Sequence, residues 1–240
     1  MKKLMFAAAA VAALCLSSES RAEDERAWAW SPLGIGIAAP LQLPFMSSDV
    51  YGIRLGGFLG YNADMYGIDV GVAGLTTGDM IGLQADAMTW TDGAACGLQV
   101  AALANVVDLN AVGLQVAPVN VVWGEVTGFQ VAALNYDTAI WGVQFGGVLN
   151  WEVSASCGWQ LGLVNADQDD FVGFALGAVN YAKSFTGFQL GAVNVTDEMC
   201  GLQLGVANAC DRMHGVQIGL FNLITSSPKL PIMVIGNASF

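Results

Sequence analysis

Residues 199–208 read Met-Cys-Gly-Leu-Gln-Leu-Gly-Val-Ala-Asn, and they carry the phrase from which most of the chain is built. The phrase is Gly-apolar-Gln-apolar-Gly/Ala-x-apolar-Asn, and it occurs twelve times between Gly52 and Asn222 with a spacing of 14 to 16 residues. It opens at Gly52, Gly67, Gly82, Gly97, Gly113, Gly128, Gly142, Gly158, Gly173, Gly187, Gly201 and Gly215. A fixed period is typical of repeat architectures, in which each unit packs against its neighbours.

The phrase has the alternation of a β-strand. In residues 199–208 the apolar side chains fall on one face, and Gly201, Gln203 and Gly205 fall on the other. A helix is disfavoured because glycine would recur inside every one, and turn-forming residues follow each Asn. Each unit is therefore predicted to be one strand of roughly 8 to 10 residues and one tight turn. Alternating segments at 31–39 and 231–240 raise the expected total to about 14 strands.

Two arrangements of these strands satisfy the pattern. The phrase is nearly palindromic about Gln, so antiparallel neighbours would still place Gln beside Gln, and this favours an all-β fold of mostly antiparallel strands closed into a shallow barrel. The alternative is a parallel β-solenoid with coils of about 15 residues.

In the barrel the apolar face would contact lipid, with Tyr and Trp near the strand ends. Those aromatic residues are Tyr61, Tyr66, Trp90, Trp123, Tyr136, Trp141, Trp151 and Tyr181. Pro118 inside the fifth repeat and the short turns count against a membrane barrel.

The first 22 residues are predicted to be a signal peptide. Lys2 and Lys3 precede an apolar stretch, and a small-x-small cleavage site ends at Ala22. Residues 23–240 then form a single β-repeat domain, with the repeat array at 52–222 and a closing strand at 231–240. Removing residues 1–22 takes away three cations and one anion, which moves the formal net charge from −12 to −14. This acidity argues against nucleic acid as a partner.

The central position of the phrase is the candidate functional row. It holds Arg54, Asp69, Gln84, Gln99, Gln115, Gln130, Gln144, Gln160, Gln189, Gln203 and Gln217, with Ala175 in place of the amide in the ninth repeat. If the row faces a lumen, it forms a neutral polar constriction across which Arg54 and Asp69 pair. If it faces neighbouring backbone or solvent, it is a structural amide ladder, and this is the interpretation that we favour.

Other residues give no sign of catalysis. His214 is the only histidine, and it has no obvious nucleophile partner for a Ser-His-Asp arrangement. Without a second histidine or clustered cysteines, a zinc site is also disfavoured. The acidic turn of Asp167, Asp169 and Asp170 lacks the glycines of calcium-binding loops. We expect the four cysteines of the mature chain to be free, because the strands that carry them are too far apart to bridge. These are Cys96, Cys157, Cys200 and Cys210. The chain is thus predicted not to be an enzyme and to use no cofactor or metal.

The GLQxGxxN units and the ending from Leu230 to Phe240 resemble exported bacterial surface-repeat proteins. The resemblance covers residues 31–240, and such repeats are also similar to the shallow symmetric barrels called β-flowers. The apolar leader, the apolar strand face and the terminal Phe240 lead us to expect an exported protein at or in the outer membrane or cell surface, with a structural or pore-like role and the lipid bilayer as partner. The alternative is a soluble periplasmic or secreted binding module that uses its Gln/Gly face or its acidic turns. No catalytic residue follows from the resemblance.

Overall fold

The computed structural model describes residues 30–38, 41–43, 48–226 and 232–239. β-Strands make up most of this part of the chain, and no helix occurs in it. The strands are β1 (Trp30–Ala38), β2 (Leu41–Leu43), β3 (Asp49–Asn62), β4 (Met65–Val70), β5 (Ala73–Thr76), β6 (Met80–Thr91), β7 (Ala95–Val107), β8 (Ala111–Val116), β9 (Val119–Glu152), β10 (Ser156–Leu176), β11 (Val179–Leu190), β12 (Val193–Leu204), β13 (Ala207–Ile224) and β14 (Ile232–Ser239). The predicted signal peptide at 1–22 lies outside the described residues.

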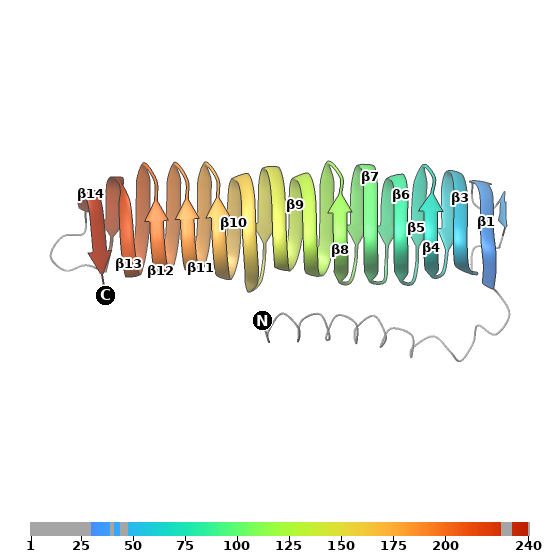
Figure 1. Ribbon diagram of the computed structural model, residues 1–240, viewed down its shortest axis with the longest axis horizontal. Coiled ribbons are helices and arrows are strands. Elements are labelled where there is room, and N and C mark those ends of the chain that lie inside the picture. Colours follow the sequence, from blue (N-terminus) through green and yellow to red (C-terminus); the bar gives the residue numbers. More distant parts are fainter. Residues whose placement is uncertain (1–29, 39–40, 44–47, 227–231, 240) are drawn as a thin grey trace. The chain divides into compact units, whose positions relative to one another are not determined.

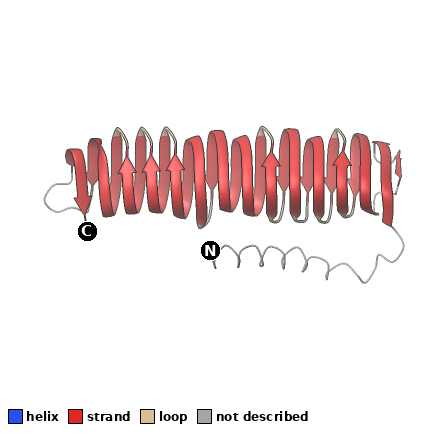
Figure 2. Ribbon diagram, in the orientation of Figure 1, coloured by secondary structure: helices blue, strands red, loops and turns tan. Residues whose placement is uncertain are grey.

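The chain divides into two compact units, one ending at Gly113 and one beginning at Leu114. Both units are built from coils, and each coil has two extended legs. In the coil that begins at Gly201, the first leg ends at Leu204, and the chain reverses at the turn Gly205–Val206. The second leg then runs from Ala207 through Asn208 towards Asp211, where the next coil approaches. Figure 2 shows these short turns between consecutive strands.

Neighbouring coils pair in parallel and in register. In the second unit β11, β12 and β13 lie side by side (Figure 1), and Gly201 pairs with Gly187 on one side and with Gly215 on the other. Gln203 is likewise flanked by Gln189 and Gln217. The first unit follows the same rule, because β3, β4, β6 and β7 align their opening glycines at positions 52, 67, 82 and 97. Identical residues therefore stack in rows that run from coil to coil.

The predicted antiparallel barrel is wrong, and the alternative, a parallel β-solenoid with coils of about 15 residues, is the fold observed. The error lies in the second half of the repeat. One strand and one tight turn leave several residues of a 14 to 16 residue period unused, whereas two legs and two reversals of the chain use them all. The segment after each Asn, predicted as a turn, is the second leg, as in Ala207–Cys210.

The strands predicted on either side of the repeats are confirmed as β1 and β14. β14 pairs antiparallel with β13, and β2 pairs antiparallel with β1, whereas β1 itself runs parallel to β3. Antiparallel pairing thus occurs at the first and last described strands, where a coil has no following or preceding coil to stack on.

Polar and apolar side chains are distributed in the opposite way to that of most globular domains. Amide side chains fill much of the interior, while Val, Leu, Ile and Phe side chains cover the outside. Apolar packing inside includes the cluster of Val50, Met65 and Met80 and the stacked rings of Phe171 and Phe185 at 5.3 Å. The outward direction of the apolar side chains follows from the alternation of the phrase, with Gln on the inner face.

Candidate functional site

The candidate row lies inside the solenoid, and in the first unit it includes a buried ion pair. The guanidinium of Arg54 donates from Nε to Oδ1 of Asp69 at 2.6 Å and from Nη2 to Oδ2 of the same carboxylate. Its Nη1 donates to Oδ1 of Asn62 at 2.5 Å. Gln84 donates to Asp69 at 3.2 Å, and Gln99 donates to Gln84 at 3.1 Å. The two charged residues therefore terminate a chain of amides and compensate each other within it.

In the second unit the row forms amide ladders with an interruption. Gln144 donates to Gln130 at 2.9 Å, and Gln130 donates to Gln115 at 2.8 Å. A second run joins Gln217 to Gln203 at 2.8 Å and Gln203 to Gln189 at 2.9 Å. Between these runs the ninth repeat places the buried Ala175 beside Gln189, whose side-chain nitrogen has no partner. The side chains of the row are buried, and within each run they are bonded to one another, which is the geometry of a structural amide ladder; Gln160 bonds instead to Glu152 and Asp167.

A second ladder was not recognised in the sequence. The Asn that closes the phrase points inward, and in the second unit each one donates to the Asn of the next coil at 2.7 to 3.0 Å, from Asn120 to Asn222. Most also donate to a carbonyl near the turn, as Asn194 does to Leu204 at 2.9 Å. The signal was the constant Asn at one position of the repeat, which we had interpreted as the end of a strand.

Three carboxyl groups also occupy the interior of the second unit. Asp137, Glu152 and Asp167 each stand two residues after a ladder Asn, and all three are buried. Gln130 donates to Asp137 at 2.8 Å, and Gln160 donates to Asp167 at 2.8 Å and to Glu152 at 2.5 Å. Burial raises the pKa of each of these carboxyl groups, because the charged form loses its hydration. Glutamine amides oppose this shift only in part.

The first unit also has a buried acid with a raised pKa, Asp86, which stands two residues after Gln84. Burial raises its pKa to about 7, and the negative charge of Asp69 adds to the shift. The charge of Arg54 acts in the opposite direction. In the folded chain Asp86 therefore keeps its proton at pH values at which an exposed carboxyl has lost it.

Stability is expected to fall as the pH rises from about 4 to about 7. The unfolded chain releases the Asp86 proton above about pH 4, whereas the folded chain holds it until about pH 7. Folding thus becomes less favourable over this interval, by on the order of 3 kcal/mol for this one group. The variant Asp86→Asn keeps an uncharged side chain and should show a smaller loss between pH 5 and pH 8 in urea titrations followed by circular dichroism. Asp92→Asn, at an exposed position, is the control; an identical pH dependence in Asp86→Asn and the unmodified protein would contradict the assignment.

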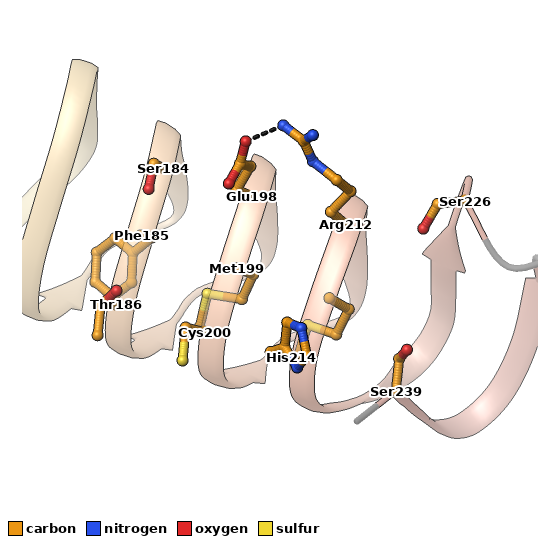
Figure 3. A pocket seen from close by; sticks show the side chains of 11 residues that line it. Ser184, Phe185, Thr186, Glu198, Met199, Cys200, Arg212, His214, Ser226 and Ser239 are labelled. Carbon is orange, nitrogen blue, oxygen red and sulfur yellow. Dashed lines mark hydrogen bonds and ion pairs between the residues drawn. The ribbon is translucent and has the colours of Figure 1, made fainter.

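The remaining polar residues named from the sequence lie on the outside or are separated. His214 and Cys200 are exposed in a shallow groove, where Arg212 forms an ion pair with Glu198 (Figure 3). Asp167 points inward while Asp170 is exposed, so the acidic turn does not converge on one point. Cys157, Cys200 and Cys210 are free thiols. Within the described residues no three His, Cys, Asp or Glu side chains are grouped so that they could hold a metal ion.

Comparisons of the chain with protein-family models, with curated proteins and with solved structures give no match. The assignment of function therefore depends on the geometry of the molecule itself.

Proposed function

We propose a function from the distribution of side chains on the outside of each unit, where the charged ones are confined to one edge. In the first unit they are Asp49, Asp79, Asp92 and Asp108, and in the second unit they are Glu125, Asp169, Asp170, Lys183, Asp197, Glu198, Asp211 and Arg212. All of them lie where the second leg of one coil meets the first leg of the next. We call this edge of each unit its acidic edge. The other charged residues among the described ones are those of the interior.

We propose that the chain is an exported, non-enzymatic repeat protein that associates with the outer membrane and has a structural role. The observation that carries the proposal is the inverted distribution of side chains, with amides inside and apolar groups outside. Large apolar side chains are exposed on both legs, for example Phe129 and Ile218 on the first leg and Tyr181 on the second. An exposed apolar surface of this extent marks a protein or membrane interaction site, because contact of apolar side chains with water is unfavourable and their burial against a partner relieves it.

The export and localisation parts of the proposal rest on the sequence, through the apolar leader at residues 1–22 and the resemblance to exported surface-repeat proteins. No helix within the described residues has the length and apolar character needed to cross a membrane. A lumen and a pore-like role are not retained, because they required the barrel.

Fractionation of cells that produce the full chain tests the proposal. We expect the protein to sediment with outer membranes and to stay in the pellet through high-salt and alkaline carbonate washes, since apolar contacts are insensitive to both. A mild detergent should then release it. A soluble periplasmic protein of the same host serves as the control for trapped material. Recovery of the folded chain in the aqueous fractions would reject membrane association and favour the soluble binding module.

A further inference from the structure

The edge opposite the acidic edge is formed by the turns between the two legs of each coil. In the second unit these turns expose Leu134, Val148, Leu163, Val206, Leu220 and Phe221, with exposed fractions from 40% to 61%. No described residue of these turns is charged. We call this the apolar turn edge of the second unit. Such a row of exposed apolar turns is unusual, because turns normally face water and carry polar side chains.

Several backbone groups of these turns are bonded within the protein. Gly205 donates its N–H to the carbonyl of Ile218 at 3.0 Å, and Val206 donates to Ala192 at 3.0 Å. The same pattern recurs one coil away, where Gly191 donates to Leu204 at 3.0 Å. Interior asparagines bond the carbonyls that precede the turns, as Asn208 does at Ile218. A turn with its polar groups satisfied internally meets the main requirement for entering hydrocarbon.

Aromatic side chains of the second unit are graded between the two edges. The Tyr and Trp residues lie near the acidic edge: Trp123 at the edge itself, Trp141 in the first leg beside it, and Tyr136, Trp151 and Tyr181 two residues from it in the second leg. Phe145 and Phe221 lie on the side of the apolar turns, and both are exposed. Trp159, one row further from the acidic edge than Trp141, is the exception. Tyr and Trp prefer the boundary between lipid and water, whereas Phe, which has no polar group, partitions into hydrocarbon.

The separation of the two edges matches one leaflet of a bilayer. Five residue steps separate Val206 from Asp211 in the extended second leg of β13, which corresponds to about 17 Å at roughly 3.3 Å per residue. Half of a hydrocarbon core of about 30 Å is about 15 Å. A unit inserted edge-on would therefore reach about the midplane while its charges stayed in water.

Building on the membrane association proposed above, we infer that the second unit enters a single lipid leaflet through its apolar turn edge. The acyl chains cover the turns and the adjoining outer faces of the legs, the Tyr and Trp side chains lie among the headgroups, and the acidic edge stays in water. A second copy of the chain would also cover apolar side chains. It would not account for the grading of aromatic residues along the legs or for the match to the leaflet.

Lysine substitutions at the two edges test the orientation. Leu163→Lys combined with Val206→Lys places two charges on exposed turns, where the fold can tolerate them. Thr138→Lys combined with Ser226→Lys places the same charge at the acidic edge. Flotation of the purified full chain with phosphatidylcholine vesicles, which carry no net charge, is the measurement. We expect the apolar-edge variant to bind at least about tenfold more weakly than the unmodified protein, and the acidic-edge variant to bind as well as it does.

A depth measurement complements the binding measurement and does not depend on added charge. A genetically encoded fluorescent amino acid at position 206 should shift its emission to the blue and be quenched by lipids with a nitroxide on the acyl chain. The same amino acid at position 226 should respond to neither.

If the protein floats but both positions give the same signal, or the apolar-edge lysines leave flotation unchanged, the orientation is wrong while membrane association stands. If the unmodified protein does not float and is also soluble after fractionation, membrane association itself fails. An apolar-edge variant that changes only the oligomeric state would indicate a second copy as the occupant and overturn the inference.

Discussion

Alanine at position 201 is expected to destabilise the second unit by roughly 3 to 5 kcal/mol. Gly201 has a φ of +139°, a backbone conformation that side-chain-bearing residues rarely adopt. A Cβ atom there would also lie 2.0 Å from the carbonyl oxygen of Gly187 in the preceding coil. The oxygen belongs to the backbone and the Cβ atom is fixed directly to its Cα, so neither can rotate away, and the coils would have to separate. Urea unfolding of the detergent-solubilised chain, followed by far-UV circular dichroism, measures the loss.

Gly147→Ala is the matched control within the same unit. Gly147 is exposed, its φ lies outside the left-handed region, and an added Cβ would meet only Ala133 Cα at 3.6 Å and the Ala132 carbonyl oxygen at 3.8 Å. These are ordinary van der Waals contacts, so the change should be within about 0.5 kcal/mol. Equal stability of Gly201→Ala and Gly147→Ala would show that the stacking of opening glycines is looser than the structure describes.

The second large effect is expected at the buried ion pair of the first unit. Arg54→Gln removes the guanidinium but leaves the Asp69 carboxylate in the interior, where it is fully buried. An uncompensated buried charge of this kind costs roughly 3 to 5 kcal/mol. Asn62 also loses a donor to its side-chain oxygen. The loss should be visible as a lower urea midpoint at pH 8, at which the carboxylate is ionised in the unfolded chain.

The double variant Arg54→Gln with Asp69→Gln separates the charge effect from simple disruption. It converts both positions to the residue that the row carries in most coils, and Gln84 provides the next amide. Because amides stack on amides throughout the row, we expect the double variant to recover most of the stability that the single variant loses. A double variant as unstable as the single one would mean that the ion pair has a role beyond mutual compensation.

The sequence predicted the strands, their period and the placement of Gln203 and its equivalents on the face opposite the apolar side chains, because alternation along the chain is a local property. Which of the two faces lies inside was left open. It did not predict parallel stacking. The palindrome about Gln is compatible with both directions, and only the length of the segment from Ala207 to Asp211 distinguishes one leg per repeat from two. The role of Asn194 in the second ladder depends on that same segment, so it was missed together with the second leg.

The candidate row was named from the sequence as a set of positions, but its bonding depends on what neighbouring coils supply. Gln160 donates to Glu152 and Asp167, which belong to the second leg and cannot be placed beside it from the repeat alone. The interruption at Ala175 was visible in the sequence. Its structural result, an unpartnered nitrogen on Gln189, depends on the register between β10 and β11.

In-register stacking of equivalent coils makes the molecule modular. Each coil uses its neighbours' glycine, glutamine and asparagine in the same way, so a gene could gain or lose one whole repeat, such as residues 187–200, and rejoin the ladders without a mismatch. Loss of half a repeat would instead bring outward side chains against inward ones. Unequal recombination between the repeats would thus yield chains with different numbers of coils and an unchanged coil cross-section.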